Sequence, residues 1–320
     1  AQQLAIAPDG RTASIVDAKG ELRIISLDDG TLQEPSQKAS GCAYLPSGEM
    51  LLAETEKRLR RMSARRTWTR ERLIGNPDDP AIFEDRVTAL AFSPDGKLLV
   101  TGGGTPSRSG EVKLWRLDGT LVREVAKAHT DTINAIAFAP DGDLFATAGS
   151  DRLACIWSAR DGSRVASLEG HAGHVLGVAW RTDGAALATS GADKSVRRWD
   201  LTTHKQTKAV TNFGGEVCAI RFVGTGDLLL AAAGDKSVRL GDQTLPESGT
   251  AYPYCAAADP SGAIVAAGSH DGTVRFWNVA DRKLLRTMQP MQMQTTKAPA
   301  AKGSSERSPE SRTNTASVAR

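Results

Sequence analysis

Residues 170–200 read GHAGHVLGVAWRTDGAALATSGADKSVRRWD. Two apolar runs in this stretch, residues 176–180 and 185–189, flank the turn sequence ArgThrAspGly, and a third run ends at Trp199. Alternation of apolar and small residues with a period of two is typical of strands, and Asp and Gly are residues of tight reversals. The stretch therefore predicts short antiparallel strands joined by tight turns.

The turn recurs seven times along the chain. Its variants include AlaProAspGly at 7–10, SerProAspGly at 93–96 and AspProSerGly at 259–262. The closing glycines are Gly10, Gly48, Gly96, Gly142, Gly184, Gly226 and Gly262. Their spacings of 36 to 48 residues bracket the ~40–45 residues of a four-stranded propeller blade. The sequence predicts an all-β chain folded as a seven-bladed β-propeller with four-stranded antiparallel blades.

The predicted propeller occupies residues 1–289. Its blades are expected at approximately 1–38, 39–82, 83–128, 129–170, 171–212, 213–249 and 250–289. Residues 290–320 are rich in Gln, Thr, Ser, Ala, Lys and Pro without periodicity, which predicts a disordered tail or a linker. Residues 283–289 read as blade seven's own fourth strand, so we expect the ring to close by packing of blade one against blade seven, without strand exchange.

Composition narrows the function classes. The chain lacks an apolar run near the roughly 18 residues of a membrane span. A net charge of +3 is too small to indicate nucleic-acid binding by itself. The four cysteines are too far apart in sequence for a metal knuckle or a redox pair, and we expect them to be buried free thiols.

The third run of each repeat carries the resemblance to a known family. Its clearest form is TrpAsp at 199–200, with weaker forms at 157–158, 277–278 and 115–116. These residues, with the repeated turn, resemble WD40-repeat propellers over residues 1 to about 289. The resemblance implies a non-catalytic protein-interaction scaffold, and we expect no enzymatic activity, no metal and no cofactor in this chain.

Two neighbouring repeats contain the same polar residues 42 positions apart. The two sets are His129, Thr147, Asp151 and Trp157, followed by His171, Thr189, Asp193 and Trp199. A His beside a hydroxyl and an Asp could be a catalytic triad, but recurrence in separate blades favours a structural role. In WD40 proteins such a set is the structural hydrogen-bond tetrad. Blade six keeps only Asp235, with Phe213, Ala231 and Gly241 at the other positions, and blade seven keeps Asp271 and Trp277.

A propeller presents loops and a central channel to its partners. The loops before each first strand and between each second and third strand should form one face. The candidate partner-binding residues there are Phe83, Arg86, Arg108, Asp131, Arg152, His174, Lys194, Phe213, Lys236, Tyr252, Tyr254 and His270. The basic stretch 57–72 has two interpretations. It is a docking strip for phosphate or an acidic partner, or, as we favour, it forms the outer two strands of blade two, whose exposed edge is protected from pairing by charge.

Segments 85–96, 102–115 and 170–180 resemble WD40 regions of planctomycete-type bacterial proteins that commonly accompany an exported c-type cytochrome domain. This resemblance implies a periplasmic propeller whose partner is a cytochrome domain in the same polypeptide, with a cytoplasmic protein as the alternative. An enzyme with its active site at the channel mouth is the least favoured alternative. We expect a monomeric ring, with protein partners, no membrane span and no nucleic acid.

Overall fold

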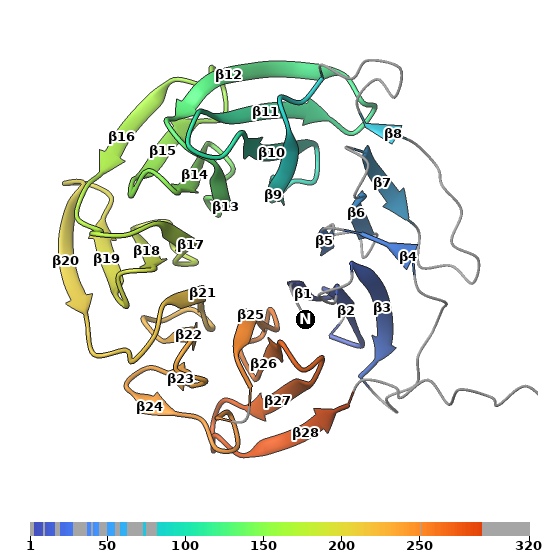
Figure 1. Ribbon diagram of the computed structural model, residues 1–320, viewed down its shortest axis with the longest axis vertical. Helices are drawn as coiled ribbons and strands as arrows, with labels where there is room; N and C mark the ends of the chain where they lie inside the picture. Colours follow the sequence, from blue (N-terminus) through green and yellow to red (C-terminus); the bar gives the residue numbers. More distant parts are fainter. Residues whose placement is uncertain are drawn as a thin grey trace, which may run out of the picture. The chain divides into compact units, whose positions relative to one another are not determined.

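The computed structural model describes residues 3–8, 10–16, 20–27, 37–39, 41–44, 50–54, 58–62, 73–74, 82–249 and 251–289. All regular structure in these ranges is β-strand, arranged in seven four-stranded antiparallel sheets. The sheets stand around a common centre like the blades of a propeller (Figure 1). The predicted fold class is confirmed.

The strands follow one another from the centre outward in each blade. Blade one contains β1 (Gln3–Ile6), β2 (Thr12–Val16), β3 (Glu21–Ser26) and β4 (Gln37–Lys38). Blade two contains β5 (Gly41–Tyr44), β6 (Met50–Glu54), β7 (Arg58–Met62) and β8 (Leu73–Ile74). Blade three contains β9 (Arg86–Phe92), β10 (Leu98–Gly104), β11 (Gly110–Arg116) and β12 (Leu121–His129). Blade four contains β13 (Ile133–Phe138), β14 (Leu144–Gly149), β15 (Ala154–Ser158) and β16 (Arg164–Leu168).

The last three blades keep this order. Blade five contains β17 (Val175–Trp180), β18 (Ala186–Gly191), β19 (Val196–Asp200) and β20 (Lys205–Val210). Blade six contains β21 (Val217–Phe222), β22 (Leu229–Ala233), β23 (Val238–Leu240) and β24 (Gln243–Thr244). Blade seven contains β25 (Pro253–Ala258), β26 (Ile264–Ser269), β27 (Val274–Asn278) and β28 (Leu284–Met288).

The repeated turns form the hairpins between first and second strands. In blade four the Gly142 amide donates to the Ala139 carbonyl at 3.0 Å, and Gly142 has φ +81°. The Gly184 turn of blade five repeats this geometry with φ +73°. Glycine reaches this left-handed region without a Cβ clash, which explains the closing glycine of these two turns.

The ring closes through its innermost strands. β1 contacts β5 on one side and β25 on the other, and the remaining first strands contact their neighbours in chain order. β28 pairs with β27 inside the sheet of blade seven, while β1 pairs with β2. Blade seven therefore completes its own sheet, as expected, and closure rests on packing between blades.

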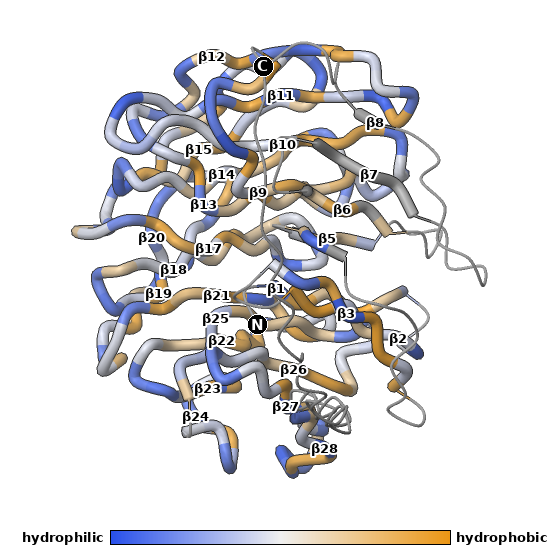
Figure 2. Tube along the Cα trace, turned by 45° about the vertical axis from the view of Figure 1, so that its right-hand side comes forward, coloured by the Kyte–Doolittle hydropathy of each residue, from blue (hydrophilic) through white to orange (hydrophobic). Residues whose placement is uncertain are grey.

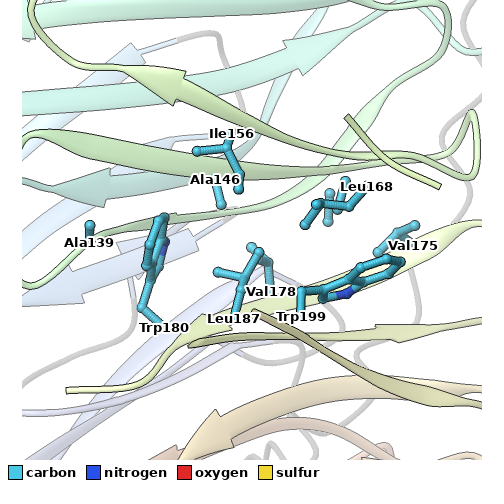
Figure 3. Close-up of a cluster of buried hydrophobic side chains, with 11 residues drawn as sticks. Ala139, Ala146, Ile156, Leu168, Val175, Val178, Trp180, Leu187 and Trp199 are labelled. Carbon is cyan, nitrogen blue, oxygen red and sulfur yellow. The ribbon is translucent and has the colours of Figure 1, made fainter. Parts of the chain in front are cut away.

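The hydrophobic core lies between blades. Between blades four and five, Ile156 and Leu168 of the first blade pack in one cluster with Leu187, Trp180 and Trp199 of the second (Figure 3). In Figure 2, apolar segments follow the strands while the most hydrophilic segments lie in the connections. Because the inner strands bury both faces against neighbouring blades, they present little side-chain surface. Binding falls to the loops and to the exposed outer strands such as β12 and β20.

Candidate functional site

Blades four and five each contain a buried four-residue hydrogen-bond chain. In blade four, His129 Nδ1 lies 2.9 Å from Asp151 Oδ1, His129 Nε2 lies 2.7 Å from Thr147 Oγ1, and Trp157 Nε1 donates to Thr147 Oγ1 at 2.8 Å. The equivalent distances for His171, Asp193, Thr189 and Trp199 are 3.0, 2.8 and 2.9 Å. The structure thus assembles both sets that the sequence singled out.

The direction of these hydrogen bonds fixes the role of the set. A carboxylate only accepts, so His171 Nδ1 carries the proton and donates to Asp193, which leaves Nε2 to accept from the Thr189 hydroxyl. Both imidazole side chains, of His129 and His171, are 0% exposed. A substrate cannot reach a side chain that is so enclosed. The hydrogen-bond chain instead ties the second and third strands to the loop that enters the blade.

The aspartates of the two sets are held ionised. Burial alone would raise the pKa of Asp193, but hydrogen bonds from Ser195, His171 and the Ala172 amide outweigh burial, and the pKa lies below its usual value. The pKa of Asp151 is lowered in the same way, with His129 as the main donor. These carboxylates stabilise the folded state as anions.

Blade three replaces the His–Asp pair with a different buried pair. Trp115 Nε1 still donates to Thr101 Oγ1 at 2.9 Å, but Phe83 occupies the histidine position and packs on Trp115 with 5.6 Å between ring centroids. Glu111 and Lys113 form an ion pair at 2.8 Å with side chains 2% and 5% exposed. The sequence analysis did not predict this ion pair. A signal was present, because Lys113 occupies the position at which blades five and six carry Arg197 and Arg239.

Blade six substitutes a cation–aromatic contact for the histidine. The Arg239 guanidinium lies 4.2 Å from the ring centroid of Phe213 and 3.4 Å from an Asp235 oxygen. In blade seven, Trp277 Nε1 donates to the Pro246 carbonyl of the preceding segment at 2.9 Å. Blades three to seven therefore fix these loops with whichever polar or aromatic partner each sequence supplies.

The candidate loop residues divide by exposure. Phe83 and Phe213 are only 2% and 7% exposed, so their expected place on the binding surface is wrong: each fills the histidine position against the aromatic or cationic side chain beside it. Tyr252 and Asp131 are half-buried. The exposed candidates are Arg86, Arg108, Arg152, His174, Lys194, Lys236, Tyr254 and His270.

Three of the exposed cations share an unusual backbone conformation. Arg152, Lys194 and Lys236 occupy the same turn of blades four, five and six, with φ of +72°, +61° and +69°. Blade seven places Gly272 at this turn, with φ +80°. A non-glycine residue in this region costs of order 1 kcal/mol. No ion pair is recorded for these three side chains within the described residues.

A small aromatic patch lies next to this arc, in blade seven. The ring centroids of Tyr252 and Tyr254 are 4.7 Å apart, and those of Tyr254 and His270 are 5.9 Å apart. Tyr252 also donates its hydroxyl to the Glu216 carboxylate. This network connects the loops of blades six and seven.

The central channel has a volume of about 500 Å³, and all seven first strands line it. Cys42, Cys218 and Cys255 lie along it on β5, β21 and β25, and all four cysteines of the chain are free. Burial raises the pKa of Cys42 to about 12 and those of Cys218 and Cys255 to about 11, so these thiols are protonated near neutral pH.

The described ranges contain neither a metal-binding cluster nor a membrane-spanning helix. There, no group of three or more His, Cys, Asp or Glu residues is placed to hold a metal ion. The same part of the chain contains no helix long and apolar enough to cross a membrane. Of the basic stretch 57–72, only the backbone of β7 is described, so the choice between its two interpretations lies outside the described residues.

Four segments of the sequence match the family model described as WD domain, G-beta repeat, namely residues 81–116, 119–158, 162–200 and 243–278. Over these four segments the chain is similar to WD40 repeats. Each match to the WD40 model ends just after Trp115, Trp157, Trp199 or Trp277, and the last three begin next to or within the outer strand of the blade before. Comparison with curated proteins finds no match. WD40 repeats generally mediate protein interactions, and WD40 propellers are typically non-catalytic.

Proposed function

We propose that this WD40 propeller is a non-catalytic scaffold that binds a protein partner through its loop face. The observation that carries the proposal is the arc of Arg152, Lys194 and Lys236, three exposed cations in left-handed turns of consecutive blades. A long basic side chain is an unfavourable choice at a position that glycine fills in blade seven. Strain retained at a surface turn is typical of a residue selected for recognition.

The arc indicates the chemistry of the partner. Successive loops of a four-stranded meander alternate between two faces, so the turns after the second strands of blades four to six all lie on one face. The exposed Arg108 in the loop between β10 and β11 extends the arc into blade three. A row of unpaired cations favours an acidic segment and accelerates its association at low ionic strength.

The aromatic patch supplies an anchor for such a segment. Tyr254 is 37% exposed and lies against His270, at the end of the arc beyond Lys236. Tyrosine buries a large area at low cost in side-chain entropy, and exposed tyrosines beside arginines are typical of interaction hot spots. We therefore assign blades three to seven as the binding sector.

The test combines charge reversal with a glycine variant. Proteins captured from the source cell by the wild-type propeller are compared with those captured by the triple variant R152E/K194E/K236E. A control, K97E/K205E/K283E, makes the same change in net charge at exposed lysines outside the arc. Partners retained by the control and lost by the arc variant support the proposal, and an unchanged set of partners contradicts it.

The glycine variant R152G/K194G/K236G separates the side chains from the backbone. It should melt at the same temperature as wild type or higher, because glycine relieves the left-handed strain. It should nevertheless lose the same partners. A variant that keeps them would show that the basic side chains do not contribute.

We also propose a finer candidate partner, a c-type cytochrome domain. The support is the resemblance of segments 85–96, 102–115 and 170–180 to cytochrome-linked propellers. The assay is direct capture of a haem protein, read by its visible absorption and lost with the arc variant. If the captured partners contained no haem, the cytochrome proposal would be wrong and the scaffold proposal would remain.

A further inference from the structure

Blade five shows how a tryptophan is normally seated in this ring. The Trp199 indole packs in the cluster that contains Ile156 and Leu168 of blade four and Leu187 of its own blade (Figure 3). Its Nε1 donates to Thr189 Oγ1 at 2.9 Å, and the residue is 2% exposed. The indole therefore fills a slot between two neighbouring blades.

The corresponding slot between blades five and six lacks a tryptophan. Gly241 stands 42 residues after Trp199, and a notch of about 50 Å³ lies beside it. Its lining consists of Val196, Arg198, Lys208, Val210, Leu229 and Ala231, together with Phe213, Gly241 and Asp242. The first six of these residues stand 42 positions after Ala154, Ile156, Ala166, Leu168, Leu187 and Thr189, respectively. Most of the residues in this second set belong to the cluster that contains Trp199. The notch is the tryptophan site of blade six without its tryptophan.

The chain fills the slot only in part, because Phe213 borders it and a space of about 50 Å³ stays open. Gly241 has φ +64° and turns away immediately after β23, which has three residues where β19 has five. The outer strand β24 is only Gln243–Thr244. Arg239, which could have reached into the space, is held by Phe213 and Asp235. The vacancy is therefore built into the backbone.

The notch has an apolar floor and a charged mouth. Val196 and Ala231 are each 4% exposed, whereas Lys208, Gly241 and Asp242 are exposed. Lys208 and Arg198 replace Ala166 and Ile156 of the preceding repeat, which adds two cations to the mouth. Arg198 is paired with Asp227 at 3.4 Å, and no ion pair is recorded for Lys208 in the described part of the chain.

We propose that this notch binds an aromatic side chain of a partner protein, with an acidic residue next to it in the partner sequence. The ring occupies the space that an indole fills in blade five, and the carboxylate pairs with Lys208. The notch of about 50 Å³ is smaller than the engineered cavity of about 150 Å³ that binds benzene, so a ring enters only as the exposed Lys208 side chain moves away from the mouth. The site lies between blades five and six, is lined by residues of β19, β20 and β22, and shares no lining residue with the loop-face arc.

The probe is the peptide acetyl-Asp-Trp-Asp-amide, compared with acetyl-Asp-Ala-Asp-amide, and the measurement is affinity from ligand-observed NMR titration. Wild type should bind the tryptophan peptide at least tenfold more tightly. Equal affinities for the two peptides, or no binding of either, would overturn the proposal.

Filling the notch is the decisive variant. Ala231→Met extends a flexible apolar chain into the empty space, so tryptophan-peptide affinity should fall at least tenfold while the melting temperature stays level or rises. Lys208→Glu should weaken the peptide severalfold, and the matched control Lys205→Glu on the same strand should not. Unchanged affinity in both Ala231→Met and Lys208→Glu would refute the site.

A gain-of-contact variant covers the case in which Ala231→Met does not fold. Ala231→Thr restores the hydroxyl that accepts the indole N–H in blades three to five. It should raise affinity for the tryptophan peptide about two- to tenfold, as expected for one hydrogen bond, and leave that of a naphthylalanine peptide unchanged. An equal change for both peptides would place the ring elsewhere. The loop-face variant R152E/K194E/K236E should bind as wild type does, so this site and the proposed scaffold face can fail separately.

Discussion

The hydroxyl of Thr189 is the central link of the blade five chain, and its removal tests the structural role assigned to that chain. Thr189→Val keeps the shape of the side chain and deletes only the oxygen that accepts from Trp199 at 2.9 Å and contacts His171 at 2.8 Å. Because Thr189 is 0% exposed, water does not replace the lost partner.

The magnitude follows from the two groups left behind. Each buried polar group without a partner costs about 1–3 kcal/mol, so the indole N–H and the imidazole nitrogen together predict a loss of about 2–6 kcal/mol in the free energy of unfolding. No cavity is created, so no packing loss is added. This is a large fraction of the ~5–15 kcal/mol that stabilises a typical domain.

The assay is equilibrium urea unfolding followed by tryptophan fluorescence and circular dichroism. Thr207→Val is the matched control, the same substitution on the exposed β20 strand of the same blade, where the change should stay within about 0.5 kcal/mol. A second comparison is Thr147→Val in blade four, which should lose as much as Thr189→Val. If the free energy of unfolding of Thr189→Val lay within about 1 kcal/mol of the wild-type value, the four-residue hydrogen-bond chain would not stabilise the blade as proposed.

Three further outcomes are expected. The pKa values of Asp151 and Asp193 are lowered in the folded state. Their stabilisation of the folded state is therefore complete above the unfolded pKa near 3.9 and is lost as pH falls through the folded pKa values. The urea midpoint should drop between pH 5 and 3, and less steeply in Asp193→Asn, whereas a rise of the midpoint on acidification would contradict the sign of the shift. Lys113→Ala leaves Glu111 buried without its cation and should cost about 3–5 kcal/mol, measured by urea unfolding; a change as small as that of an exposed lysine would show that water reaches Glu111. Lys194→Gly should raise the melting temperature by relieving a left-handed residue, as scanning calorimetry would show, and a lower melting temperature would mean that the lysine stabilises its turn.

The fold could be predicted from local features of the sequence. Seven turns that close on glycine and alternating apolar runs specify strand length, reversal and pairing between neighbours in the chain. These interactions are short-range, which is why four strands a blade and seven blades follow from spacing alone. The His–Thr–Asp–Trp sets were equally visible, because their members recur at one fixed distance and meet within a single blade.

The site depended on contacts that spacing does not encode. Phe83 and Phe213 occupy loop positions in the sequence, yet both are buried, because the neighbouring Trp115 ring and the Arg239 guanidinium cover them. The left-handed turns of the basic arc are a property of backbone torsion. Composition gave no sign of them.

By itself, the sequence of this seven-bladed propeller determined the strands, the turns and the blade count, since each of these rests on residues close together in the chain. Only the tertiary structure decided which loop residues face solvent, how the Glu111–Lys113 pair is enclosed and where a tryptophan site stands vacant. The physical reason is that burial and empty volume are set by two surfaces meeting. At Gly241 the missing indole leaves a notch only because blade five, from across the interface, supplies the opposite wall.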